Sequence, residues 1–196
     1  MLYNSALRNG TVQESAWPTE RFEHYGSIGK RWNIVTEPPP NELYQCDVIY
    51  CEPPFPAGLK VFDRRAGEST KDYTVFAEAF AEVWRTISVP KYAIVNHRLL
   101  TKLPAPLGIV VVKLNNAKER LAYWDAPKPE EGQTNLSVCK WLGKSFTRLG
   151  DITCGYGMPV LHFVRSRPGN TFFASDYDPH CITVLSRLTK EAIPND

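Results

Sequence analysis

The last third of the chain alternates strands and helices, and this alternation constrains the fold more than any other feature. A strand that ends at Asp151 precedes a helix over roughly 159–167, a strand over 171–175 and a last helix that starts near Pro179. Successive strands joined by helices form parallel units with right-handed crossovers. The sequence therefore predicts an α/β fold with a doubly wound, mostly parallel sheet and helices on both faces.

The turn between the first strand and helix of this unit is rich in glycine. It reads Asp151-Ile152-Thr153-Cys154-Gly155-Tyr156-Gly157. Glycines two residues apart allow a sharp turn and close approach to a ligand, and the next helix presents its positive N-terminal end. About twenty residues further on, Asp176 and Tyr177 follow the next strand, where an acid can bind ribose hydroxyls. Gly-x-Gly alone is a weak signal, but the acid at this distance makes the pattern moderately specific.

The same turn lacks two features of the common phosphate-binding loops. It has no Lys-Ser or Lys-Thr pair, and Met158-Pro159 stand where a third glycine would complete the dinucleotide fingerprint. A nucleotide-like cofactor without a pyrophosphate fits this turn better.

A second motif follows an earlier apolar run. Val48 to Cys51 reads as a short buried strand, which ends abruptly at Glu52-Pro53-Pro54-Phe55. The prolines remove backbone donors, so the nearby carbonyl groups are free to accept hydrogen bonds from another group. With Phe55 as a stacking surface, the motif suits a planar amine. A simple strand-ending turn is the commoner explanation for an isolated Pro-Pro pair.

Composition sets broad limits on function. A chain of 196 residues can form one sizeable core, and a formal charge of +2 permits a nucleic-acid partner without requiring one. The five cysteines are odd in number and lack C-x-x-C spacing, which argues against a disulfide framework and a zinc site. No signal peptide or membrane-spanning run is apparent, so we expect a cytoplasmic protein with reduced thiols.

The remaining segments are assigned more coarsely. Residues 1–45 are expected to be an N-terminal extension packed on a single globular domain over 46–196, with an early strand over 31–35. Lys30, Arg31 and Trp32 are interpreted as a solvated edge with a half-buried tryptophan. The polar loop 58–67 follows the Pro-Pro motif, and its cations are either phosphate contacts or solvated charges.

The middle of the chain predicts more regular elements. A helix that starts near Lys71 carries a core-facing row of apolar residues, and strands follow over 92–96, 108–114 and 121–125, the last two as an antiparallel pair. His97 is interpreted as a structural or surface histidine. A helix over 136–146 precedes the C-terminal unit.

The two motifs in this order resemble a known family. The chain is similar to the permuted S-adenosylmethionine-dependent amino-methyltransferases, which act on adenine N6 or cytosine N4. In that family, a strand ending in Asp/Asn/Ser-Pro-Pro-Tyr/Phe/Trp precedes one ending in Asp-x-Phe-x-Gly-x-Gly. Residues 51–55 take the first place and residues 151–157 the second, and the resemblance covers roughly residues 45–190.

The resemblance implies a Rossmann-like methyltransferase fold, S-adenosylmethionine as cofactor, and methylation of an exocyclic base amine. Adenine N6 is the first candidate and cytosine N4 the second, and DNA is favoured over RNA as the polymer, as in restriction–modification systems. It also implies that the protein forms a homodimer or binds a partner subunit, and that it needs no metal ion and does not associate with a membrane. The target-base residues would be Glu52, Pro53, Pro54 and Phe55. The cofactor residues would be Cys51, Gln133, Asn135, Asp151, Thr153, Cys154, Gly155, Gly157, Asp176 and Tyr177. The nucleic-acid contacts would be Lys60, Arg64 and Arg65.

The chain departs from the family pattern in two ways, which leave other functions open. Glu52 replaces the usual Asp, Asn or Ser, and Glu-Pro-Pro resembles the motif of the catalytically silent partner in the eukaryotic messenger-RNA adenosine methyltransferase. The interval between the motifs is also too short for a large target-recognition insert. A silent subunit that binds nucleic acid or a catalytic partner is therefore the alternative, and a small-molecule methyltransferase or another nucleotide-binding enzyme also remains open.

Overall fold

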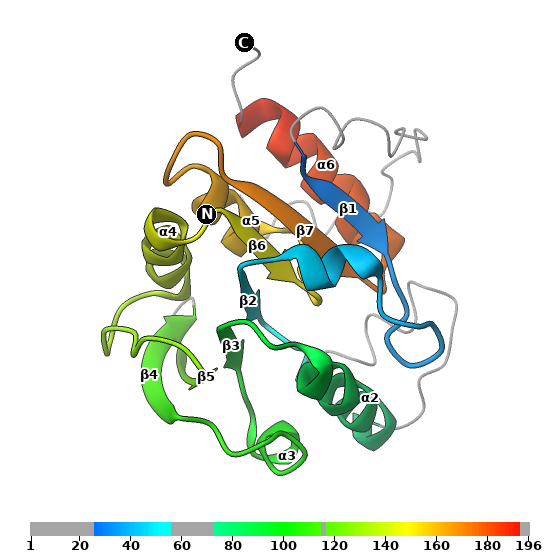
Figure 1. Ribbon diagram of the computed structural model, residues 1–196, viewed down its shortest axis with the longest axis vertical. Helices are drawn as coiled ribbons and strands as arrows, with labels where there is room; N and C mark the ends of the chain where they lie inside the picture. Colours follow the sequence, from blue (N-terminus) through cyan, green and yellow to red (C-terminus); the bar gives the residue numbers. More distant parts are fainter. Residues whose placement is uncertain (1–25, 56–72, 115–116, 193–196) are drawn as a thin grey trace.

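A seven-stranded mixed sheet forms the centre of the protein (Figure 1). The computed structural model describes residues 26–55, 73–114 and 117–192. The strands lie in the order β1-β7-β6-β2-β3-β5-β4. In chain order, the elements are β1 (Ile28–Arg31), the 3-10 helix η2 (Asn41–Gln45), β2 (Val48–Cys51), α2 (Tyr73–Thr86), β3 (Lys91–Ile94), α3 (His97–Leu100), β4 (Gly108–Leu114), β5 (Ala117–Trp124), α4 (Asn135–Ser145), β6 (Arg148–Asp151), α5 (Met158–Val164), β7 (Thr171–Asp176) and α6 (Pro179–Ala192).

The pairing of the strands confirms the predicted fold class. Strands β1, β7, β6, β2 and β3 run parallel to one another, while β5 is antiparallel to both β3 and β4. The expected antiparallel pair of strands is therefore β4 and β5. The early strand is Ile28–Arg31 instead of 31–35, because Asn33 begins a tight turn in which its side chain accepts a hydrogen bond from the Val35 amide at 3.0 Å.

Helices cover both faces of the sheet because the central strands are buried on both sides. All four residues of β2 are buried. Val48 and Tyr50 face a core shared with α4, α5 and α6, whereas Ile49 and Cys51 face a core shared with α2. We call these the α4 face and the α2 face of the sheet. The alternation of successive side chains along a strand produces the two cores.

The apolar row predicted for the first long helix is the buried face of α2. Phe76, Phe80 and Trp84 succeed one another at four-residue spacing, and their rings contact in sequence with centroids 5.9 and 5.2 Å apart. Lys91 closes the C-terminal end of this helix, since its ammonium group donates to the Ile87 carbonyl at 2.5 Å and to the Trp84 carbonyl at 3.3 Å. The predicted start of this helix near Lys71 lies outside the described residues.

The chain reverses its direction of winding between β2 and β6, which lie side by side. From β2 the chain crosses through α2 to β3 on one side, and from β6 it crosses through α5 to β7 on the other. Ligands of open α/β sheets bind at such a switch point, outside the carboxyl ends of the strands. Both sequence motifs follow these two strands, so the topology places them at one edge.

The described residues offer neither a membrane span nor a cluster of metal ligands. No helix among them is long and apolar enough to cross a membrane. No group of three or more His, Cys, Asp or Glu side chains in the described ranges could hold a metal ion. The five cysteines are all free and buried.

Candidate functional site

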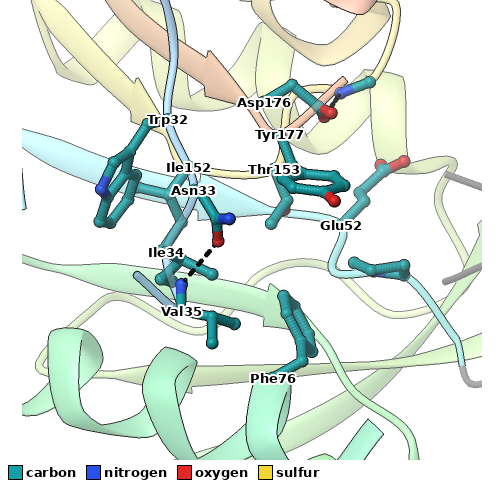
Figure 2. Close-up of a pocket in the computed structure, with 12 residues that line it drawn as sticks. Trp32, Asn33, Ile34, Val35, Glu52, Phe76, Ile152, Thr153, Asp176 and Tyr177 are labelled. Atoms are coloured by element: carbon teal, nitrogen blue, oxygen red, sulfur yellow. Dashed lines mark hydrogen bonds between the residues drawn. The ribbon is translucent and has the colours of Figure 1, made fainter. Parts of the chain in front are cut away.

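A pocket lies at the carboxyl edge of the sheet and joins the two sequence motifs (Figure 2). It has about 660 Å³ of space, open solvent included. Figure 2 shows Trp32, Ile34 and Val35 along one side, with Glu52 and Tyr177 across from them. The lining residues are Trp32, Asn33, Ile34, Val35, Glu52, Pro54, Phe76, Ile152, Thr153, Gly155, Asp176 and Tyr177.

The glycine-rich turn after β6 depends on both of its glycines. Gly155 and Gly157 have φ angles of 51° and 78°, a conformation that other L-residues rarely adopt. A Cβ atom on Gly157 would lie 2.2 Å from Cδ1 of Leu185 in α6, so this glycine is needed for packing. A Cβ atom on Gly155 would meet nothing within 4 Å. Gly155 lines the pocket, and the space where its side chain would stand is open.

Asp176 fastens this turn to the end of β7. Its Oδ2 atom accepts a hydrogen bond from the Gly155 amide at 2.8 Å, and its Oδ1 atom accepts one from the Asp178 amide at 2.9 Å. Burial raises the pKa of Asp176 to about 6, even though these hydrogen bonds lower it. A carboxylate has about four acceptor positions, so Asp176 can still accept hydrogen bonds from a ligand in the pocket.

Asp151 adds a second buried carboxyl at the end of β6. Its Oδ1 atom accepts a hydrogen bond from the Thr153 amide at 3.1 Å. Its Oδ2 atom is buried and has no hydrogen-bond partner within the described part of the chain. Burial raises the pKa of Asp151 well above its usual range, and the negative charges of Glu52 and Asp176 raise it further. The edge therefore favours a ligand that brings positive charge and hydrogen-bond donors.

Glu52 is held in place by two donors on the same oxygen atom. Oε1 accepts a hydrogen bond from the Tyr50 hydroxyl at 2.9 Å and one from the Asn135 side-chain amide at 2.5 Å. Asn135 is the first residue of α4, whose N-cap Thr134 accepts a hydrogen bond from the Ser137 amide. Burial raises the pKa of Glu52, although both hydrogen bonds lower it. The second carboxylate oxygen, Oε2, has no hydrogen bond to the residues that the structure describes.

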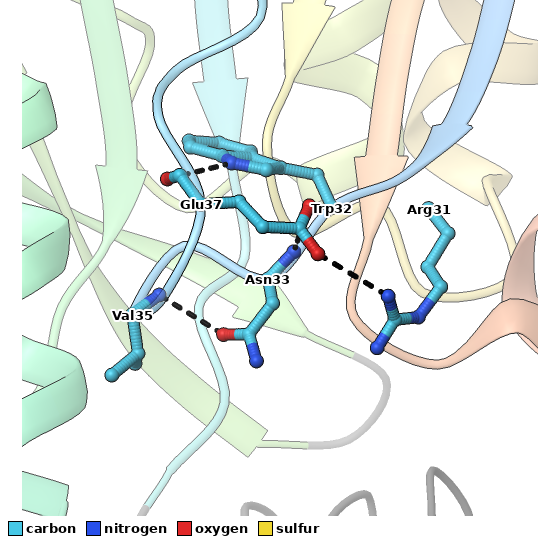
Figure 3. A network of polar contacts seen from close by, with 5 residues as sticks. All are labelled: Arg31, Trp32, Asn33, Val35 and Glu37. Atoms are coloured by element: carbon cyan, nitrogen blue, oxygen red, sulfur yellow. Dashed lines mark hydrogen bonds and ion pairs between the residues drawn. The ribbon is translucent and has the colours of Figure 1, made fainter.

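The turn after β1 forms one wall of the pocket, and hydrogen bonds to Glu37 stabilise this turn (Figure 3). The Glu37 carboxylate accepts hydrogen bonds from the Arg31 guanidinium and the Asn33 amide, both at 3.3 Å. The Glu37 carbonyl accepts a hydrogen bond from the Trp32 indole at 3.3 Å. This network fixes the backbone on which the wall residues lie.

The buried position of Trp32 corrects one expectation. Lys30 and Arg31 are exposed, as expected for an edge, but Trp32 is 2% exposed and lines the pocket. The side chain turns inward because the chain remains bonded to β7 at this point, with the Trp32 amide donating to the Asp176 carbonyl at 3.0 Å.

The structure brings together part of the predicted site in the pocket lining. Of the predicted target-base residues, Glu52 and Pro54 line it, and of the predicted cofactor residues, Thr153, Gly155, Asp176 and Tyr177 do so. Phe55 is half-buried and packs against the core of the α4 face.

Other predicted residues lie behind or beside the lining. Cys51, Asp151 and Cys154 are buried beneath it, Pro53 is also buried, and Gly157 packs on α6. Gln133 is half-buried and bonds through its carbonyl to the Lys113 amide in β4. Asn135 reaches the site through Glu52. Lys60, Arg64 and Arg65 lie outside the described residues, and their role stays a prediction.

Sequence reasoning missed the wall from the turn after β1 and the contribution of α2. Asn33, Ile34 and Val35 follow a short strand that pairs with β7, far away in sequence, so no local pattern indicates their position. Phe76 belongs to the apolar row that predicts only a core position, yet it is both 5% exposed and part of the lining. The triple proline Pro38-Pro39-Pro40 is a local sign of an extended connection before β2, but it does not indicate which side chains line a pocket.

Comparison with known proteins identifies the fold. No family model and no curated protein matches this sequence. Among solved structures, TTHA0409 from Thermus thermophilus, a candidate DNA modification methylase, matches with a TM-score of 0.54 and 11% identity over 83% of this chain and 92% of that chain. The structure of TTHA0409 complexed with S-adenosyl-L-methionine matches with a TM-score of 0.53 and 9% identity, over 83% and 91% of the two chains. M1.HpyAVI matches with a TM-score of 0.50 and 11% identity over 82% of this chain and 97% of that chain.

At these identities the likeness concerns the fold alone. It extends over more than four-fifths of this chain and nearly all of each matched chain. The resemblance inferred from the sequence motifs is thereby confirmed for the fold, and this chain has the α/β fold of the DNA modification methylases.

Proposed function

We propose that this protein transfers a methyl group from S-adenosylmethionine to an exocyclic amine of a nucleic-acid base, with adenine N6 in DNA as the first candidate. One observation carries the proposal. Glu52 and Pro54 after β2 line the same pocket as Gly155 after β6 and Asp176 after β7, although the two motifs are about a hundred residues apart.

The residues at this edge fit S-adenosylmethionine. The cofactor carries a ribose diol, an ammonium and a sulfonium, and it supplies the methyl group when it is bound. Asp176 has acceptor positions left for the diol, and the Asp151 carboxyl, buried beneath the lining, would favour a positively charged group in the pocket. Gly155 provides room for close approach. The structures of TTHA0409 and M1.HpyAVI in complex with this cofactor support the choice.

The residues after β2 would hold the acceptor amine. Oε2 of Glu52 and the carbonyls of the Pro-Pro segment can accept the two hydrogens of an exocyclic amine and so orient its lone pair. A base must leave its stack to enter such a pocket, so a single-stranded or flipped nucleotide is the expected substrate form. Phe55 stays our predicted stacking surface, and Lys60, Arg64 and Arg65 stay predicted phosphate contacts.

The direct test is transfer of labelled methyl groups. Purified protein is incubated with methyl-labelled S-adenosylmethionine and single-stranded or duplex DNA, with RNA in parallel, and the nucleosides are separated and identified by mass. We expect label in N6-methyladenine from DNA. Glu52→Gln should reduce transfer by about tenfold or more, because it replaces an acceptor by a donor at the amine. Failure of the wild-type protein to transfer label to either polymer would contradict the proposal.

The hydrogen bonds of Glu52 favour one alternative. Because Tyr50 and Asn135 already occupy Oε1, the carboxylate resembles a structural group as much as a substrate acceptor. A catalytically silent subunit that binds nucleic acid or a catalytic partner would retain such an arrangement. Glu52→Asp distinguishes the two functions in the same assay: methyl transfer that appears only in this variant would favour the silent subunit.

A further inference from the structure

Strands β4 and β5 end the sheet on one side (Figure 1), and every second residue of β4 from Ile109 to Lys113 is exposed. Residues directly opposite in this antiparallel pair share a face of the sheet. Val111 is opposite Arg120, and Lys113 is opposite Lys118. Two residues from Arg120 along β5, Ala122 belongs to the core of the α2 face. Lys113, Lys118 and Arg120 therefore lie on the α2 face of the sheet, at exposed positions.

We call Lys113, Lys118 and Arg120 the hairpin cations. All three are exposed, and none makes an ion pair within 4 Å with another residue of the described ranges. Glu119 lies between two of them in sequence but points to the opposite face, because its partner Val112 is buried in the core of the α4 face. The hairpin thus carries three exposed cations that have no ion-pair partner in the described part of the chain.

Strand register places the hairpin cations near the pocket. Cys51 is level with Ala93 in β3, and Ala93 is level with Ala122 in β5. Strand β5 is antiparallel to β3. Arg120, two residues before Ala122 in β5, therefore lies beyond the carboxyl end of β3, in the same direction in which Pro53 lies beyond Cys51. At about 4.8 Å between strands, β5 lies roughly 10 Å sideways from β2. Lys113 and Lys118 extend further beyond the same carboxyl edge.

Part of the pocket wall also lies on the α2 face. Trp32, Phe76 and Ile152 line the pocket and belong to the core of this face. The hairpin cations and the pocket therefore lie on one face and at one edge of the sheet. A nucleic-acid strand with one base in the pocket could therefore continue across the hairpin, with its phosphates near these cations.

We propose that Lys113, Lys118 and Arg120 bind backbone phosphates of the nucleic acid whose base enters the pocket. This inference rests on the proposed function and adds to it a surface for the polymer. Charge complementarity selects this partner, since cations that pair with no acid of the described ranges attract phosphates, and lysine and arginine are the usual phosphate-binding side chains. The contacts would position the strand without reading its sequence.

A second copy of this chain is the competing occupant of the hairpin. Leu107, Ile109 and Val111 are 70%, 41% and 37% exposed and form an apolar row at the other end of the same surface. This row points away from the carboxyl edge of the sheet, whereas the cations lie at that edge. The experiment below includes the oligomeric state for this reason.

The salt dependence of DNA binding tests the proposal without requiring catalysis. A fluorescein-labelled single DNA strand of mixed sequence is titrated with wild-type protein, Lys113→Gln/Lys118→Gln, and Arg120→Gln, between about 50 and 200 mM salt. The control is Lys140→Gln/Lys144→Gln, which removes the same charge from exposed positions of α4 on the opposite face of the sheet. Sedimentation gives the oligomeric state, and calorimetry with S-adenosylmethionine is run on every variant.

We expect the slope of log affinity against log salt to become shallower by about 1.4 in the double variant and about 0.7 in Arg120→Gln. The control should keep the wild-type slope, and all variants should bind the cofactor as the wild type does. Equal slopes in all variants would overturn this inference. If the same variants still bound S-adenosylmethionine, the proposed function would be unaffected. Absence of DNA binding by the wild type, or a dimer lost only in the hairpin variants, would also overturn it.

Discussion

Three carboxyl groups meet at the carboxyl edge of the sheet, and burial raises the pKa of each. They are Glu52, Asp151 and Asp176. Hydrogen bonds from backbone amides hold Asp151 and Asp176, while side chains hold Glu52. Buried acids of this kind are costly to ionise in the free protein, and a cationic ligand would relieve that cost.

The raised pKa of Asp176 should make the stability of the protein depend on pH. Its pKa is about 6 in the folded protein against 3.8 as its ordinary value. Between these values the folded state holds a proton that the unfolded state releases, so the free energy of unfolding falls as the pH rises, by about 3 kcal/mol from this residue. Denaturant unfolding at pH 4 to 7 should therefore show a steeper decline for the wild type than for Asp176→Asn.

The same titration should govern ligand binding at Asp176. Only the ionised carboxylate accepts both hydroxyls of a diol, so S-adenosylmethionine should bind about tenfold more weakly at pH 5 than at pH 7. Parallel stability curves for wild type and Asp176→Asn would contradict the assigned pKa. An unchanged cofactor affinity over this pH range would contradict the role of Asp176 in binding.

At the scale of elements, the turn between β6 and α5 depends on its contact with α6. Gly157 is the N-cap of α5 in a left-handed conformation, and its position against Leu185 leaves no space for a side chain. The turn is bonded to β7 as well, since the Cys154 amide donates to the Ser175 carbonyl at 2.9 Å. Three elements therefore fix the shape of the turn that lines the pocket.

Substitution of Gly157 by alanine tests this packing. The new Cβ would lie 2.2 Å from Leu185, so Gly157→Ala should lower the free energy of unfolding by roughly 3 kcal/mol. Gly169→Ala is the matched control, because Gly169 has a φ angle of 82° but nothing within 4 Å of the added Cβ. It should cost about 1 kcal/mol from backbone strain alone. Equal losses in urea unfolding would show that the contact with Leu185 is unimportant.

The elements differ in how well the sequence predicts them. Strand β2 and the C-terminal unit were predicted because apolar runs, prolines and glycines are local signals. Strand β1 was misplaced by about three residues, because its position depends on pairing with β7 across most of the chain. Helix α5 ends at Val164 instead of near Arg167, since Arg165 begins a turn that the apolar pattern does not reveal.

At the scale of the whole molecule, the winding of the chain brings distant segments to one edge. The motif pair was sufficient to predict the fold and the two ends of the pocket, Glu52 and Asp176. It was insufficient for the wall of Trp32, Ile34 and Val35, since contacts between chain segments decide which side chains line a pocket. The link from Asn135 to Glu52 was not predicted either, because it joins residues 83 positions apart.

Calorimetric titration with S-adenosylmethionine at pH 7 tests the central claim most directly. The wild-type protein and the control Asp125→Asn, an exposed residue outside the pocket lining, should bind the cofactor equally. Asp176→Asn should bind at least about tenfold more weakly, because an amide cannot accept both ribose hydroxyls, a loss of about 1.4 kcal/mol or more. No binding by the wild-type protein, or equal binding by Asp176→Asn, would contradict a cofactor site at the carboxyl edge of β6 and β7.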